Sequence, residues 1–221
     1  MSSTLTCIEI PATSIPIYSI IWLHGLGADG HDFESVVPEL SLNKAENINF
    51  VFPNAPIQAV TINGGAKMRS WYDILDASLD REVAVDDIYK SAAQLTQIIQ
   101  NEISKGIKAE NIVLAGFSQG GVIALHAGLR YPQKLAGIIA LSTYMPTTEQ
   151  LETERAPANN ETSIFMAHGT MDPVIQLRIA EDSFNRLKAM DYPISWHQYP
   201  IEHSLCLEEI TDISNYINRI L

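Results

Sequence analysis

The sequence predicts an α/β protein in which helices cover both faces of a mainly parallel sheet. Short apolar runs recur along the whole chain, and segments with a helical spacing of apolar residues lie between them. Most of the runs lack polar alternation, so each is expected to be covered on both faces. Strands and helices that alternate in this way are joined by right-handed crossovers, which makes neighbouring strands parallel.

The expected strands are rich in β-branched and aromatic residues and are bounded by turn residues. They span residues 18–23, 49–52, 112–117, 135–141, 163–168 and 194–199. Four helices are expected between and after them. The clearest covers residues 82–105, where apolar residues recur every three or four positions and Gly106 stands at the expected end. A second covers residues 119–130 and is closed by Pro132. A third is marked by Ile179, Phe184 and Leu187, and a fourth by a C-terminal stripe of Ile210, Ile213, Ile217 and Leu221.

Two segments have no clear period. Residues 147–162 are polar and rich in glutamate, and they are expected to form a surface excursion between two strands. Residues 55–79 contain paired glycines and a Trp-Tyr pair, and a long loop of this kind is expected to line a site. No repeat or linker divides the chain, so residues 1–221 are expected to form one domain.

The composition excludes several classes of protein. Of 221 residues, 46% are hydrophobic and 18% are charged, which is typical of a globular protein and not of a disordered one. The 14 basic and 26 acidic residues give a net charge of -12, which disfavours nucleic acids and anionic lipids as partners. No apolar run approaches the roughly 20 residues that span a bilayer.

The N-terminal residues and the cysteines indicate a cytoplasmic protein. Residues 1–12 do not have the pattern of a secretory signal. Cys7 and Cys206 are too few for a disulfide framework and lack metal-ligand spacing, so two free thiols are expected, with a single bridge as the alternative. No metal site is predicted, because the only candidate cluster is a loop without helical pairing, formed by His24, Asp29, His31 and Asp32.

The strongest functional signal is Gly116-Phe117-Ser118-Gln119-Gly120, a match to G-x-S-x-G where a predicted strand meets a predicted helix. A serine there needs a strained backbone, and a glycine two residues to either side removes side chains that would collide in the bend. Its hydroxyl then stands at the carboxyl edge of the sheet, at a helix N-terminus whose dipole favours negative charge. The motif predicts Ser118 as a nucleophile.

A serine nucleophile requires a histidine base and an acid that orients the base. His203 follows the last predicted strand, in a short loop before the C-terminal helix, and is the expected base. Asp172 lies in the loop after the preceding strand and is the expected acid, because the order serine, acid, histidine is usual with this motif. His168 closes a strand and is better placed to hold a loop than to act as the base.

The glycine-rich loop of residues 24–30 allows two interpretations. Its glycines spell G-x-G-x-x-G, the fingerprint of a dinucleotide site, which would make the chain an oxidoreductase. That fingerprint needs a helix at the third glycine and an acidic residue after the second strand, but Pro38 and residues 52–54 do not fit. The favoured interpretation is an oxyanion hole in which Leu26 and Gln119 donate their backbone N–H groups.

Six motifs follow one another along the chain: WLHGLGADG at residues 22–30, VTINGG at 60–65, SWYDI at 70–74, AGFSQGG at 115–121, ALSTY at 140–144 and EHS at 202–204. Together they resemble the carboxylesterase and acyl-protein thioesterase family of α/β-hydrolases, with the bacterial carboxylesterase branch as the most similar. The resemblance implies a single α/β-hydrolase domain without a large lid, a triad of Ser118, His203 and Asp172, and no cofactor.

The resemblance also implies the substrates. Relatives cleave acyl esters, thioesters or lysophospholipids, and an apolar acyl pocket is implied around Met68, Trp71, Ile74 and Tyr144. Apolar loops around such a pocket often associate, so a homodimer is a further expectation. A carboxylesterase for short to medium acyl chains is the favoured function. The alternatives are a thioesterase or lysophospholipase, a nucleotide-dependent oxidoreductase, and a catalytically silent binding protein with this fold.

Overall fold

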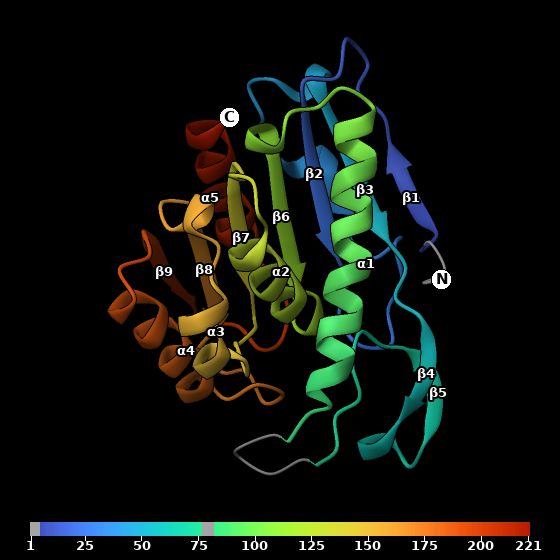
Figure 1. Ribbon diagram of the computed structural model, residues 1–221, viewed down its shortest axis with the longest axis vertical. Helices are drawn as coiled ribbons and strands as arrows, with labels where there is room; N and C mark the ends of the chain where they lie inside the picture. Colours follow the sequence, from blue (N-terminus) through green and yellow to red (C-terminus); the bar gives the residue numbers. More distant parts are fainter. Residues whose placement is uncertain (1–4, 77–81) are drawn as a thin grey trace.

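The computed structural model describes residues 5–76 and 82–221, and it confirms an α/β fold built on one central sheet. Seven strands lie in the order β1-β3-β2-β6-β7-β8-β9. Their bounds are β1 Cys7–Ile10, β2 Tyr18–Leu23, β3 Ile48–Pro53, β6 Ile112–Phe117, β7 Gly137–Leu141, β8 Ser163–Gly169 and β9 Ile194–Tyr199. Every neighbouring pair is parallel except β1 and β3, so the carboxyl ends of six strands meet at one edge, the lower one in Figure 1.

Helices cover both faces of the sheet, which explains why most strands are apolar throughout. Four lie on one face, namely α1 Val85–Ser104, α2 Gln119–Arg130, α3 Thr148–Glu154 and α4 Leu177–Ala189. The C-terminal helix α5, Leu207–Ile220, lies on the other face, where Ile213 and Ile217 are buried against the sheet (Figure 1). The four helices expected from the sequence are therefore present, with the first one beginning at Val85.

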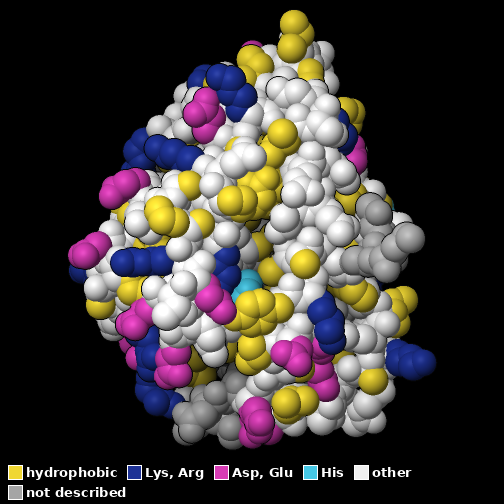
Figure 2. Space-filling view, in the orientation of Figure 1, with side chains coloured by type: hydrophobic (Ala, Val, Ile, Leu, Met, Phe, Trp, Pro, Cys, Tyr) yellow, Lys and Arg dark blue, Asp and Glu magenta, His cyan; other side chains and the backbone are white. Residues whose placement is uncertain are grey.

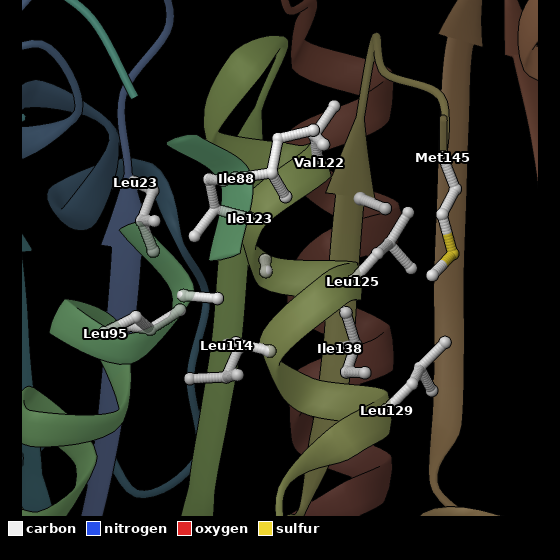
Figure 3. Packing of buried hydrophobic residues seen from close by; sticks show 14 of the residues in the cluster. Leu23, Ile88, Leu95, Leu114, Val122, Ile123, Leu125, Leu129, Ile138 and Met145 are labelled. Carbon is white, nitrogen blue, oxygen red and sulfur yellow. The ribbon is translucent and has the colours of Figure 1, made fainter. Parts of the chain in front are cut away.

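The core between α1, α2 and the sheet fixes the helix that follows Ser118. Figure 3 shows Ile88 of α1 near Ile123 of α2, and Leu95 of α1 near Leu114 of β6. These four side chains are fully buried, and burying an aliphatic side chain of this size contributes about 1.5–3 kcal/mol. Because α2 is buried along nearly its whole length, its first turn is held rigidly against the strand ends.

The segment of residues 147–162 is more buried than the sequence analysis expected. The prediction of a surface excursion is wrong in part, because the segment contains α3 and because Leu151 and Asn159 are 0% exposed. The Asn159 side chain accepts from the Leu135 N–H at 2.9 Å and donates to the carbonyl oxygen of Tyr131 at 2.7 Å. A composition rich in glutamate does not reveal that one asparagine ties the segment to the connection between α2 and β7.

The long loop expected over residues 55–79 contains a two-stranded hairpin. Its strands are β4 Ile57–Val60 and β5 Ala66–Arg69, which pair with each other and not with the central sheet. Residues 77–79 of that stretch lie outside the described residues. The hairpin and β1 were not predicted, since both are short and only half-buried. The strand predicted at residues 135–141 begins at Gly137.

The two cysteines and the surface are also defined. Cys7 and Cys206 are free, which confirms the expectation of two unpaired thiols. Within the described residues, no helix is long and apolar enough to cross a membrane. On the face seen in Figure 2, acidic and basic side chains are interspersed around groups of hydrophobic ones, so the net negative charge does not form one continuous area on this face.

Candidate active site

Ser118 sits on a strained turn between β6 and α2. Its backbone angles are φ 54° and ψ -119°, which a residue with a side chain rarely adopts. A Cβ added at Gly116 would lie 2.3 Å from the carbonyl of Gly120, and one at Gly120 would lie 2.4 Å from the carbonyl oxygen of Leu23. Only glycine fits at either position, so the spacing of the motif follows from the packing of the turn.

Hydrogen bonds to residues at the end of the neighbouring strand β7 hold the strained backbone of Ser118 in place. The Ser118 N–H donates to the carbonyl oxygen of Leu141 at 2.9 Å. The Thr143 hydroxyl donates to the carbonyl oxygen of Ser118 at 2.7 Å. Thr143 was not singled out by the sequence analysis. Two bonds from residues at the end of β7 thus fix the backbone of the turn, and Ser118 itself is 8% exposed.

Asp172 and His203 are brought together by the loops after β8 and β9. The His203 Nδ1–H donates to Asp172 Oδ2 at 2.6 Å, and the imidazole ring lies 4.7 Å from the ring of Phe117, the residue before Ser118. Asp172 Oδ1 accepts from the N–H groups of Val174 and Ile175 at 2.7 and 2.9 Å. With Nδ1 protonated, His203 Nε2 is left as the nitrogen that can accept a proton.

Asp172 is held in its ionised form. Burial raises the pKa of this carboxyl, but hydrogen bonds from His168, His203 and the Ile175 N–H outweigh burial and hold the pKa well below its usual range. Asp172 is 7% exposed, so little water competes for these bonds. A carboxylate that stays charged and fixed can keep His203 in the tautomer described above.

Ser118 and His203 are not hydrogen-bonded to each other in the described residues, although Ser118 follows β6 and His203 follows β9 at the same carboxyl edge of the sheet. Hydrogen bonds of this kind often tighten only when a substrate is bound. The structure therefore brings together the predicted acid and base, with the predicted nucleophile at the same edge of the sheet.

The backbone N–H groups of Leu26 and Gln119 have no acceptor among the described residues. The N–H that follows Leu26, of Gly27, donates to the carbonyl oxygen of Arg69 at 2.9 Å. Gly27 has φ 81°, which turns the loop at this point. Gln119 is the first residue of α2, and N–H groups in a first helical turn have no partner within the helix.

His24 and Trp71 fix the loop that carries Leu26. His24 is 1% exposed, its Nδ1–H donates to the carbonyl oxygen of Gly25 at 2.6 Å, and its Nε2 accepts from the Ala55 N–H at 3.1 Å. Burial lowers the pKa of His24, which is consistent with a neutral ring. The Trp71 Nε1–H donates to the carbonyl oxygen of His24 at 2.8 Å.

The same segment also binds the side chain of Gln119. Gln119 Oε1 accepts from the Trp71 N–H at 3.0 Å and from the Ser70 hydroxyl at 3.2 Å. Gln119 Nε2 donates to the carbonyl oxygen of Tyr72 at 2.8 Å. Residues 70–72 therefore contact both the Leu26 loop and the start of α2. The SWYDI motif was recognised in the sequence, but its contacts were not predicted.

The glycine-rich loop does not lead into a long helix. After residue 30 the described chain forms a 3₁₀ helix, η1 Glu34–Glu39, with Pro38 inside it. The Gly30 N–H donates to Asn54 Oδ1 at 3.0 Å, at the end of β3 where a dinucleotide site would need a carboxylate. The requirements for a dinucleotide fingerprint are absent from this described part of the chain.

The four predicted pocket residues are spread over the site. Trp71, Ile74 and Tyr144 are 1%, 4% and 4% exposed, so the indole is a packing and hydrogen-bonding group. The Met68 sulfur lies 3.9 Å from the Cβ position of Gly27, on the side of the Leu26 loop. Of the four, Tyr144 lines a cleft of about 610 Å³ between the N-terminus of α1, α3 and α4, together with Val83, Met145, Arg178 and Ile179.

The sequence of the chain matches a known protein family. Residues 10–221 match the Phospholipase/Carboxylesterase family. The chain belongs to this family. It is accordingly an α/β-hydrolase and an enzyme of the hydrolase class. The match covers all the elements that carry Ser118, Asp172 and His203, and it agrees with the resemblance seen in the sequence.

Fungal and plant proteins are among the relatives at 30% identity or more. The chain is 39% identical over 222 residues to acyl-protein thioesterase 1 of Neurospora crassa, covering 96% of this chain and 90% of the relative. It is 36% identical over 221 residues to acyl-protein thioesterase 1 of Yarrowia lipolytica, covering 96% of both. The crystal structure of Arabidopsis thaliana SOBER1 superimposes with a TM-score of 0.87 at 30% identity, covering 92% of this chain and 98% of that one. These eukaryotic relatives do not support the expected bacterial branch.

Proposed function

We propose that this chain is an acyl-thioester hydrolase that also cleaves carboxylic esters, with Ser118, His203 and Asp172 as its catalytic triad. The hydrogen bond between His203 Nδ1 and Asp172 Oδ2, beside a serine on a strained strand-to-helix turn, is the observation that carries the proposal. The thioesterase function is preferred to the carboxylesterase first favoured from the sequence, because the relatives with 39% and 36% identity are named acyl-protein thioesterases.

The proposed reaction has two steps. Ser118 Oγ attacks the acyl carbon while His203 Nε2 takes the hydroxyl proton and Asp172 holds the Nδ1–H. The negative charge that forms on the acyl oxygen is bound by the N–H groups of Leu26 and Gln119. His203 then gives its proton to the departing thiolate or alkoxide. In the second step His203 takes a proton from a water molecule as its oxygen attacks the acyl carbon. The bond from that carbon to Ser118 Oγ breaks, His203 returns the proton to the serine, and the carboxylic acid is released.

Acyl recognition is proposed for the cleft that Tyr144 lines. Its described walls combine apolar side chains with Arg178 and other charged groups. Met68 is proposed to contact the part of the substrate nearer the Leu26 loop, while Trp71 and Ile74 support the site from the core. A small molecule or acylated peptide is the expected partner, and cytoplasmic location and a homodimer stay predictions.

A matched substrate set tests this function. One peptide is prepared with the same acyl group on a cysteine as a thioester and on a serine as an oxyester, in chain lengths from 2 to 16 carbons. The proposal expects kcat/KM at least tenfold higher for the thioester at the preferred length. An equal or higher kcat/KM for the oxyester would instead support the carboxylesterase function. A preference for a lysophospholipid would indicate a lysophospholipase.

A further inference from the structure

His168, the histidine near the end of β8, also contacts Asp172. Its Nε2 lies 2.8 Å from the carbonyl oxygen of Ile175 and 3.3 Å from Asp172 Oδ2. That carboxylate oxygen is the one that accepts from His203 Nδ1 at 2.6 Å. Two histidines therefore share one oxygen of the acid, and the proposed reaction uses only one of them.

The surroundings of His168 determine which nitrogen carries its proton. A carbonyl oxygen only accepts hydrogen bonds, so Nε2 must be the donor toward Ile175. Nδ1 is buried without a hydrogen-bond partner in the described part of the chain, and the side chain is 0% exposed. Nε2 is therefore the nitrogen of His168 that donates, and Nδ1 takes part in no hydrogen bond there.

The position of this donor is set by the sheet and by aromatic packing. His168 lies in register with Gln198 of the neighbouring strand β9. Its ring stacks at 6.4 Å from Trp196, another residue of β9, and Phe184 of α4 stacks at 5.3 Å from the same indole. The loop that carries Asp172 is thus tied to a rigid part of the fold through His168.

We propose that His168 is a positioning residue for the triad: its Nε2–H holds Ile175 and Asp172 and thereby sets the place of His203. The inference rests on the proposed function, because it assumes that Asp172 and His203 serve Ser118. The Nε2–H of His168, 3.3 Å from Asp172 Oδ2, also offsets part of the negative charge on the oxygen that faces His203. Without it, Asp172 would stabilise the protonated form of the base more strongly.

Glutamine and asparagine at position 168 form a matched pair of test variants. The amide nitrogen of glutamine can reach the place of Nε2, whereas that of asparagine reaches only the place of Nδ1. We expect His168→Gln to keep kcat within about threefold of the parent, and His168→Asn to lose about 10- to 100-fold in kcat with KM little changed. The acid limb of the kcat/KM profile should move to higher pH by about half a unit in the asparagine variant alone.

A role limited to folding would give a different result. It would lower the Tm of both variants and leave the acid limb of the correctly folded enzyme in place, so circular dichroism and Tm are measured beside the kinetics. The inference is overturned if the acid limb of His168→Asn stays at the parent pH, or if His168→Gln is as impaired as His168→Asn.

A measurement without substrate separates this inference from the proposed function. In protein labelled with ¹⁵N-histidine, NMR at pH 7 should show His168 protonated at Nε2 and bare at Nδ1, in the parent and in Ser118→Ala. A ring protonated at Nδ1 would refute the positioning role whatever the activity is. A parent protein that shows this tautomer but hydrolyses no thioester or ester would refute the proposed function instead.

Discussion

The indole Nε1–H of Trp71 donates to the carbonyl oxygen of His24 at 2.8 Å, which joins the segment after β5 to the loop after β2. Through its own N–H, Trp71 also binds the side chain of Gln119 at 3.0 Å. One residue therefore contacts the segments that carry both proposed oxyanion donors, Leu26 and Gln119. The alignment of those two N–H groups is expected to depend on it.

Replacing Trp71 tests this dependence. Trp71→Phe removes the bond to His24 but keeps most of the buried ring, so we expect kcat to fall about tenfold with little change in KM. Trp22→Phe is the matched control, because Trp22 is 1% exposed and its Nε1 has no hydrogen-bond partner in the residues that the structure describes. Equal losses of kcat in the two variants would contradict the assigned role of Trp71.

The charge of Asp172 is expected to matter more than its shape. Asp172→Asn cannot hold the Nδ1–H tautomer of His203, and we expect a loss of about 10³- to 10⁴-fold in kcat while KM stays within about threefold. Glu202→Gln is the control, since it removes the carboxylate next to His203 in the sequence. Steady-state kinetics that show a larger loss for the glutamate variant would point to a different acid.

The glycines around Ser118 are expected to differ from other buried glycines. Gly120→Ala would place a Cβ 2.4 Å from the backbone oxygen of Leu23, which cannot move without separating α2 from β2. Gly128→Ala, further along α2, would meet only side-chain atoms, the nearest being the terminal carbon of Ile138 at 2.6 Å, and these shift more easily than backbone. We expect the first variant to lose at least about 100-fold in kcat/KM and the second to keep most of it. Similar activity in both would contradict the steric explanation of the motif.

Glu209 is expected to make stability depend on pH. Burial raises the pKa of this carboxyl to about 8. A hydrogen bond from the Cys206 N–H lowers the pKa and the charge of Asp212 raises it, and both effects are smaller than that of burial. The folded protein therefore binds a proton that the unfolded chain releases above about pH 4.3, and the free energy of unfolding falls as pH rises from there through about 8.

Substituting Glu209 shows the size of this effect. Glu209→Gln keeps an oxygen for the Cys206 N–H and cannot ionise, so its Tm should match the parent near pH 4.5 and exceed it by about 5 °C at pH 8.5. Glu208→Gln, at the neighbouring exposed position, is the control. A Tm difference for Glu209→Gln that is the same at both pH values would rule out this titration.

The features that could be predicted from the sequence are those that depend on local patterns of residues. Continuous apolar runs identified six strands, and three- and four-residue spacing identified the main helices, because burial on both faces leaves a direct trace in composition. The position of Ser118 followed in the same way from two glycines that the turn requires. Asp172 and His203 could be expected at one sheet edge, since parallel strands bring their carboxyl ends together.

Features that depend on single contacts between distant segments could not be predicted. Nothing local marks Trp71 as the partner of His24, and a buried indole gives the same apolar signal whether it lines a pocket or supports a loop. The burial of Leu151 in a glutamate-rich segment was missed for the same reason. The sequence marks His168 as a residue that holds a loop, but its contact with the acid of the proposed triad required the structure.

The central claim, that Ser118 is the nucleophile of an acyl-enzyme mechanism, is tested most directly by covalent labelling with mass analysis. The protein is treated with a fluorophosphonate and digested, and the modified peptide is identified, in parallel with thioester and ester hydrolysis by Ser118→Ala. The account predicts one adduct, on Ser118, and a loss of about 10³-fold or more in kcat for Ser118→Ala. An adduct on another residue, or hydrolysis by Ser118→Ala at the parent rate, would contradict it.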